Sequence, residues 1–128
     1  PARIYRQPAT LFAADFMGET NKVAATATAA GLQTPFGLLP LSAPVAGRAT
    51  VCLRPESIAI DDGAVRIGPA KIRDAAFFGT HWRAHLVPDS APELVLVAHL
   101  PANAAPEEGT DLVLSADADA FRVYATED

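Results

Sequence analysis

Short stretches of alternating apolar and polar residues, separated by turn residues, run through most of the chain. From position 21 onward they are rich in Val, Ile, Thr and Leu and bounded by Gly, Pro and Asp, a pattern typical of β-strands. The predicted strands are 22–29, 34–39, 48–53, 57–60, 65–67, 71–78, 82–87, 93–100, 111–115 and 121–124. Predicted turns lie at 61–63, 68–69, 88–90 and 106–109. Short strands at this spacing favour a small antiparallel barrel over a doubly wound α/β sheet.

The first twenty residues have a different pattern and are expected to form a short helical segment that leads into the barrel. Phe12 and Phe16 fall at helical spacing, so we expect them to share a face that fastens the segment to the barrel. Gly18 is placed to end the helix. The predicted organisation is therefore a helical linker over 1–20 followed by an all-β domain over 21–128.

Composition supports one folded domain. A chain of 128 residues and 13.4 kDa buries about two thirds of its surface on folding. Half of the residues are apolar, which argues against disorder. The net charge of -5 makes a nucleic acid or an anionic membrane a poor partner. The longest uncharged stretch, 23–47, is long enough to span a bilayer, but its glycines, prolines and threonines indicate strands and turns instead.

Few residues of the chain are candidates for metal binding or nucleophilic catalysis. His81 and His85 stand four residues apart on a predicted strand, roughly 13 Å, which is too far for one zinc ion without further ligands. With Arg83 they are expected to form a solvated strand face. Cys52 is the single cysteine, so no internal disulfide forms, and we expect it to be a small buried side chain.

The remaining motifs favour structure over catalysis. The acidic pairs at 61–62 and 107–108 adjoin glycines and are expected to be turns. Phe77, Phe78 and Trp82 could stack nucleic-acid bases, but the acidic charge balance disfavours that function. No phosphate-binding loop, G-x-S-x-G elbow or H-E-x-x-H motif occurs. We therefore expect no enzyme activity, no catalytic or metal-binding residues and no cofactor in this chain.

Three local patterns together resemble a known family. They are the opening Ile4-Tyr5-x-x-Pro8 with its continuation to Asn21, the run Leu53-Arg54-Pro55-Glu56-Ser57-Ile58, and Phe78-Gly79 before another strand. In this order and spacing they resemble the TOBE (transport-associated OB) domain at the carboxyl end of ATP-binding subunits in maltose, polyamine, ferric-iron and sulfate importers. The resemblance implies an OB-like barrel that is not itself catalytic.

The same resemblance implies partners and a location. The domain would follow an ATPase domain that binds ATP and Mg, help two copies of the subunit to pair, and meet the permease subunits through the ATPase domain. The complex would sit on the cytoplasmic face of the cell membrane, and some family members sense a small-molecule regulator. A fragment of such a subunit would explain why the chain opens on Pro1 and has no phosphate loop, and a trimmed or processed chain stays an alternative.

The transported solute is less well defined. The stretch 16–21 looks most similar to polyamine-type members, with ferric-iron-type members next. The alternative function is a stand-alone barrel that binds a small ligand such as an oxyanion or a metabolite. The chain lacks the Ser-Ala-Arg-Asn stretch associated with molybdate-binding barrels of related fold, which weakens the oxyanion option.

The residues of these patterns also have expected structural roles. Asn21 is suited to an unusual backbone angle or to a hydrogen bond within a turn. Pro55 should hold Arg54 extended, and Arg54 and Glu56 are expected to form an ion pair that closes the turn. Gly79, after Phe78, is expected to mark a bulge or bend in a strongly curved strand.

Overall fold

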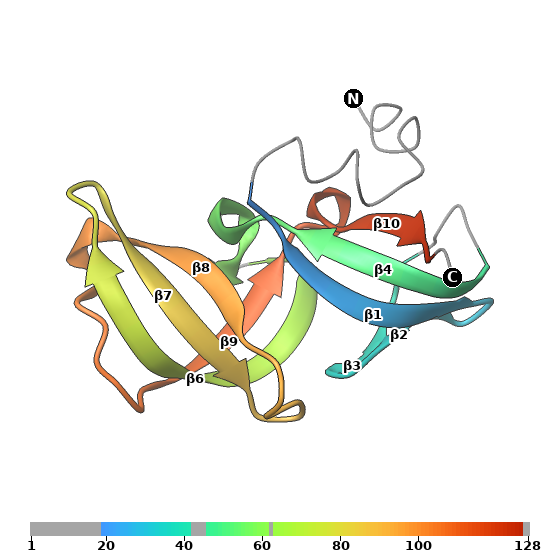
Figure 1. Cartoon of the computed structure of the whole chain (residues 1–128), viewed down its shortest axis with the longest axis horizontal. Helices are drawn as coiled ribbons and strands as arrows, with labels where there is room; N and C mark the ends of the chain where they lie inside the picture. Colours follow the sequence, from blue (N-terminus) through green and yellow to red (C-terminus); the bar gives the residue numbers. More distant parts are fainter. Residues whose placement is uncertain (1–18, 42–45, 62, 127–128) are drawn as a thin grey trace.

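A computed structural model describes residues 19–41, 46–61 and 63–126, and this part of the chain is almost entirely β-structure. Its ten strands form two five-stranded antiparallel sheets, which lie side by side in Figure 1. The expected all-β, OB-like class is confirmed. The predicted helical segment, with Phe12, Phe16 and Gly18, lies outside the described residues except for positions 19 and 20.

The first sheet, called sheet A, has the strand order β10-β4-β1-β2-β3. Buried and exposed residues largely alternate along β1, as a sheet with one solvated face requires. The register is set by pairs such as Val23 with Val51 on β4. The bounds of its strands are β1 (Asn21–Thr28), β2 (Gly31–Thr34), β3 (Gly37–Leu39), β4 (Gly47–Leu53) and β10 (Arg122–Ala125).

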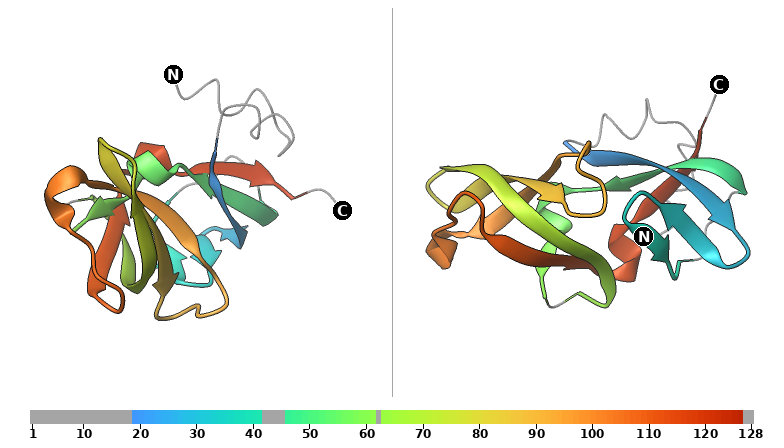
Figure 2. Two further views of the ribbon diagram at one scale, coloured as in Figure 1. Left: turned by 60° about the vertical axis from the view of Figure 1, so that its left-hand side comes forward. Right: turned by 90° about the horizontal axis from the view of Figure 1, so that it is seen from below.

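The second sheet, sheet B, has the strand order β5-β9-β6-β7-β8 and curls into a half-barrel, as both views in Figure 2 show. The curl centres on the 13-residue strand β6, whose register shifts between Arg66 and Gly68 and again between Ile72 and Asp74. Such bulges bend and twist a strand. The bounds are β5 (Ala59–Ile60), β6 (Val65–Phe77), β7 (His81–Pro88), β8 (Leu96–Pro101) and β9 (Asp111–Ala116).

One continuous apolar core joins the two sheets. Leu32 and Val51 of sheet A belong to the same buried cluster as Leu86 and Leu114 of sheet B. The chain passes from β4 to β5 through the short 3-10 helix η1 (Pro55–Ser57) and returns through η3 (Ala118–Ala120). No helix among residues 19–41, 46–61 and 63–126 is long and apolar enough to cross a membrane.

Several predicted element boundaries are wrong. The stretch 34–39 is two strands, because the Thr34 hydroxyl accepts a hydrogen bond from the N–H of Phe36 and donates one to the carbonyl of Gly37, which closes a turn. The predicted turn at 68–69 is part of β6, next to a bulge between Arg66 and Gly68, so the predicted strands 65–67 and 71–78 form one strand.

Two further predicted strands are shorter than expected. The strand expected at 57–60 is only β5, since η1 occupies the residues before it. The strand expected at 93–100 begins at Leu96, because the N–H of Leu94 donates to the carbonyl of Ala91 and closes a turn. The predicted turns at 88–90 and 106–109 fall at connections between strands, as expected.

Candidate functional site

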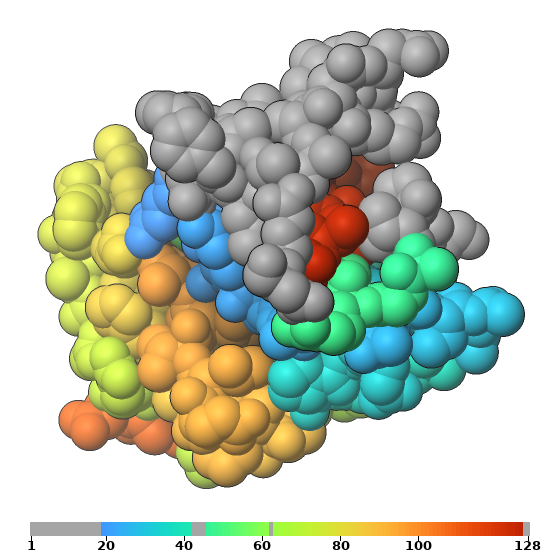
Figure 3. All heavy atoms as spheres, turned by 45° about the vertical axis from the view of Figure 1, so that its right-hand side comes forward, coloured from blue at the N-terminus to red at the C-terminus, as the bar shows by residue number. Residues whose placement is uncertain are grey.

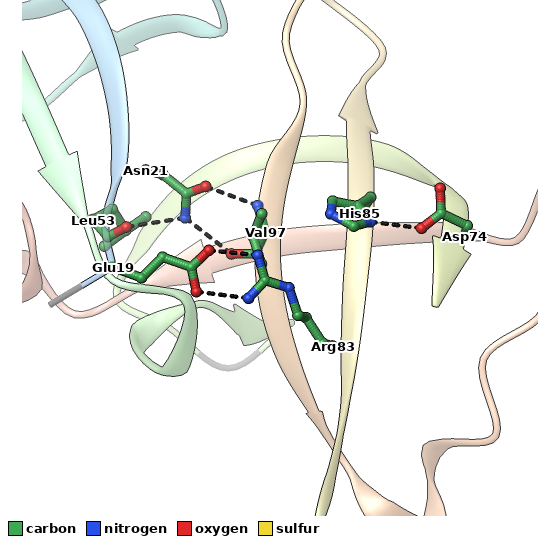
Figure 4. A network of polar contacts seen from close by, with 7 residues as sticks. All are labelled: Glu19, Asn21, Leu53, Asp74, Arg83, His85 and Val97. Carbon is green, nitrogen blue, oxygen red and sulfur yellow. Dashed lines mark hydrogen bonds and ion pairs between the residues drawn. The ribbon is translucent and has the colours of Figure 1, made fainter. Parts of the chain in front are cut away.

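Asn21 joins the two sheets through its side chain. It lies at the start of β1, is only 8% exposed, and its carboxamide makes three hydrogen bonds, drawn in Figure 4. Nδ2 donates to the carbonyl of Leu53 in sheet A at 3.0 Å and to the carbonyl of Val97 in sheet B at 2.9 Å. Oδ1 accepts from the N–H of Val97 at 2.8 Å. One side chain thus connects β1, β4 and β8.

These bonds protect an edge of sheet B. Strand β8 is an edge strand, and its neighbour β7 pairs with it on one side only. Edge strands leave backbone groups unpaired. The Asn21 carboxamide takes the place of a neighbouring strand for Val97, because it donates to the carbonyl and accepts from the N–H of the same residue. The expected local turn role of Asn21 is therefore wrong, and its backbone is not at a positive φ.

A second contact ties the approach to β1 onto sheet B. Glu19 forms a two-pronged ion pair with Arg83 of β7, with Nη1 to Oε1 at 2.8 Å and Nη2 to Oε2 at 2.5 Å. Paired parallel hydrogen bonds of this kind fix orientation as well as distance. In Figure 3 the blue atoms at the start of β1 adjoin the yellow and orange atoms of β7 and β8. Together Glu19 and Asn21 hold this part of the chain against β7 and β8.

His85 continues the polar face of β7 toward β6. Its Nδ1 lies 2.6 Å from Oδ1 of Asp74, and because a carboxylate only accepts, the ring donates the hydrogen. This hydrogen bond, with a smaller contribution from Arg73, holds the pKa of the Asp74 carboxyl below its ordinary value of 3.8. The expected solvated face of β7 is confirmed, since His81, Arg83 and His85 are partly exposed whereas Ala84 and Leu86 are buried.

The end of β6 and its connection to β7 carry exposed aromatic side chains. Phe77 and Phe78 are 51% and 60% exposed. The Phe77 ring lies 5.0 Å from Trp82, and the Phe78 ring stacks at 5.8 Å on His81, all between centroids. Gly79 has a φ of +88° and lies in this connection, where the chain bends between β6 and β7, so of the expected bulge or bend the structure has a bend outside the strands.

The run 54–56 forms a structural corner beside β8. Arg54 has φ -74° and ψ 148°, so the prediction that Pro55 follows an extended residue is confirmed. Pro55 is buried and begins η1, which packs against β8. No ion pair between described residues joins Arg54 to Glu56, so that prediction is wrong. The corner is closed by the backbone instead, since the N–H of Ser57 donates to the carbonyl of Arg54 at 3.0 Å.

The described residues bring no three potential metal ligands together. Cys52 is buried and packs with Tyr124, as expected for a structural cysteine. His81 and His85 do not meet; His81 lies against His99, with ring centroids 4.2 Å apart. The chemistry that this surface offers is therefore ion pairing, hydrogen bonding and aromatic contact.

The family follows from the match of residues 51–123 to the TOBE domain. That match covers more than half of the chain and includes strands from both sheets. The chain belongs to the TOBE domain family. The resemblance seen in the sequence is thereby confirmed.

Relatives of this TOBE domain are named as ATP-binding proteins of importers. It is 33% identical to an Fe(3+) ions import ATP-binding protein of Streptomyces avermitilis, over 91% of this chain and 34% of that protein. It is also 33% identical to a spermidine/putrescine import ATP-binding protein of Ruegeria pomeroyi, over 75% of this chain and 28% of that protein. A sulfate/thiosulfate import ATP-binding protein of Chromobacterium violaceum is also 33% identical, over 78% of this chain and 29% of that protein. The chain spans about a third of the length of these relatives.

The sequence patterns do not predict two ion pairs of this TOBE domain. The Glu19–Arg83 pair joins residues 64 positions apart, and the Asp74–His85 pair joins neighbouring strands whose register is shifted by a bulge. The available signal is a charged residue in a strand with apolar neighbours on both sides. Arg83 fits that description, because it alternates with Trp82 and Ala84.

Proposed function

We propose that this TOBE domain is the carboxy-terminal regulatory and dimer-supporting part of the ATP-binding subunit of an ABC solute importer. The observation that carries the proposal is the family match together with relatives that are all named as import ATP-binding proteins. Since the chain spans about a third of those relatives, ATP hydrolysis belongs to another part of the subunit, and ATP and Mg bind there. The TOBE domain itself is non-catalytic.

The proposed role is mechanical. Two contacts hold the segment before β1 on sheet B, namely the Glu19–Arg83 pair and the bonds from Asn21 to Val97. A displacement of Glu19 should therefore move β7 and β8 as well, because these contacts couple the position of residue 19 to the two strands. Such coupling lets the TOBE domains of two subunits stay together while the ATPase domains open and close.

Pairing with a second copy of the subunit calls for a self-complementary surface. The connection with Phe77 and Phe78 is suited to that role, because these two side chains are the most exposed large apolar groups of the described residues. Burying a phenylalanine is worth about 1.5–3 kcal/mol, so two of them from each copy contribute substantially to pairing.

The names of the relatives support a proposal for the solute and the location. We propose a ferric-iron-type or polyamine-type solute, and identity alone does not rank the two since both relatives are 33% identical. The subunit would bind permease subunits at the cytoplasmic face of the membrane. Uptake of labelled ferric iron and of labelled spermidine, compared in cells with and without the subunit, separates the two solutes.

The pairing role is tested on the full-length subunit by sedimentation equilibrium. The variant Phe77→Ser/Phe78→Ser should weaken the dimer at least tenfold, which corresponds to about 1.4 kcal/mol. Leu38→Ser is the matched control, because Leu38 is 49% exposed but lies on sheet A. Equal dimerisation of all three proteins would contradict the pairing surface. A subunit that dimerises equally well after removal of the whole TOBE domain would contradict the dimer-supporting role.

A further inference from the structure

Sheet B does not close into a full barrel, and a pocket occupies the gap. Its two edge strands, β5 and β8, pair with β9 and β7 but not with each other. A cavity of about 320 Å³ lies between them, at the small end of the usual range for ligand pockets. In Figure 1 the connection from β8 to β9 runs past this side of the curled sheet.

The interior of the pocket is apolar. Ile60 of β5, Ile72 of β6, Leu100 of β8 and Leu112 of β9 line it, so each wall comes from a different strand. The segment 104–107 forms its rim. A small hydrocarbon group is therefore favoured here over a polar or extended ligand.

The rim is held in place by the backbone. The N–H of Gly109 donates to the carbonyl of Ile72 at 2.7 Å, and the N–H of Ile72 donates to the carbonyl of Thr110 at 3.0 Å. The N–H of Thr110 donates to the carbonyl of Glu107 at 3.1 Å. The segment that carries Glu107 is thus fixed to β6 next to the pocket, so the cavity exists before a ligand arrives.

Glu107 is the one charged residue among those that line the cavity. No ion pair within the described residues engages Glu107 or its neighbour Glu108. The nearby Lys71 is already engaged, because Nζ lies 2.6 Å from Asp111 and 4.0 Å from Asp89. Among the described residues that line the pocket there is therefore one carboxylate without an ion pair and no cation.

We propose that this pocket binds a small organic cation, with a compact apolar body against Leu100 and Leu112 and an ammonium group against Glu107. The apolar walls of the pocket would contact the apolar body of the ligand, and the Glu107 carboxylate would pair with its ammonium group. An oxyanion would find no cationic partner among the lining residues. This site gives the domain a means to sense a metabolite, and its test does not depend on the transport function proposed above.

Three probes with the same ring test the assignment: cyclohexylammonium, cyclohexanol and cyclohexanecarboxylate. Each is titrated into the 15N-labelled 128-residue chain at neutral pH, and the backbone amide shifts are followed by NMR. We expect saturable shifts at Ile72 and within 104–112 for the ammonium compound, weaker ones for the alcohol, and none for the carboxylate. Equal affinity for all three, or no saturable shift from the ammonium probe, would overturn the proposal.

The neighbouring carboxylates provide a matched pair of variants. Glu107→Gln should weaken binding of cyclohexylammonium about fivefold, the size expected for a partly exposed charge contact. Glu108→Gln removes the same charge but not a lining residue, so its affinity should stay within about twofold of the original. Ala104→Trp should fill the mouth and abolish binding, with the amide spectrum unchanged away from the lining residues at 60, 72 and 100–112. Equal losses in the two glutamine variants would overturn the contact with Glu107.

Discussion

The carboxamide of Asn21 pairs with both backbone groups of Val97, as a neighbouring strand would. The two residues are 76 positions apart, and their contact joins the first strand of sheet A to the edge strand of sheet B. The third bond of the same side chain, to the carbonyl of Leu53, leaves no polar atom of the carboxamide without a partner. This arrangement links the segment before β1 to the half-barrel.

Replacement of Asn21 should therefore be costly. Asn21→Ala leaves three buried or half-buried backbone groups without their partner, and we expect a loss of about 2–3 kcal/mol in the free energy of unfolding. Asn21→Asp keeps the shape but loses both N–H donors, so it should cost at least as much. Chemical denaturation measures both. Asn103→Ala, at an exposed site in η2 (Ala102–Ala104), should change stability by less than about 0.5 kcal/mol. Equal effects at positions 21 and 103 would contradict the bridging role.

The Glu19–Arg83 pair should show a measurable interaction energy. A double-mutant cycle with Glu19→Ala and Arg83→Ala is expected to give about 0.5–1 kcal/mol at low salt, since the pair is two-pronged and only partly exposed. The energy should shrink in about 1 M salt, where the screening length is about 3 Å. The same cycle on Lys71 and Asp111, which are more exposed, should give less. A coupling of zero for Glu19 and Arg83 would mean that the contact does not hold the segment.

Gly31 and Gly37 allow a comparison of steric fit at positive φ. A Cβ at Gly31, with φ +140°, would lie 2.4 Å from the carbonyl oxygen of Leu39. A Cβ at Gly37, with φ +111°, would meet nothing within 4 Å. Gly37→Ala should therefore cost about 1–2 kcal/mol for backbone strain alone, and Gly31→Ala about 3 kcal/mol or more. Thermal unfolding of both variants checks this order, and a milder effect at Gly31 would refute the close approach of β2 and β3.

The Asp74–His85 bond should make stability depend on acid pH. Because the pKa of Asp74 is lower in the folded chain than its ordinary value of 3.8, the ionised carboxylate stabilises the fold above about pH 4. That stabilisation is lost as the pH falls through the folded pKa. The melting temperature of Asp74→Asn should thus lie below that of the original chain at about pH 6, and the difference should narrow toward about pH 2.

An exposed aspartate serves as the control for this pH profile. Asp119 is exposed and forms no ion pair with another described residue, so Asp119→Asn should follow the original chain across the whole range. If the difference between Asp74→Asn and the original chain stays constant with pH, ionisation of Asp74 does not contribute to stability.

The fold class was accessible from the sequence because alternation of buried and exposed residues is a local property. Strands such as β1, β4 and β7 fall within one or two residues of their predicted ranges. The division into two sheets was not accessible, since it depends on which distant strands pair. Gly68 and Pro69 show the limit of local signals, because these residues are typical of a turn but lie within β6 and pair with β9, next to the bulge between Arg66 and Gly68.

The candidate residues show the same limit. The family pattern includes Asn21, but the partners of its side chain lie 32 and 76 residues away, beyond the reach of any local rule. The predicted Arg54–Glu56 ion pair does not form, because proximity in sequence does not determine where two side chains at the surface point. The pocket between β5 and β8 could not be foreseen at all, since its walls come from four strands that meet only in the folded chain.

The central claim is that this TOBE domain acts as part of an importer ATP-binding subunit. The most direct measurement is the size of the native polypeptide in its own cells, by blotting with an antibody to this domain. We expect a band about three times heavier than 13.4 kDa, in keeping with relatives of which the chain spans 34%, and we expect it in the membrane fraction. A band at 13.4 kDa in the soluble fraction would contradict the claim and favour a stand-alone ligand-binding barrel.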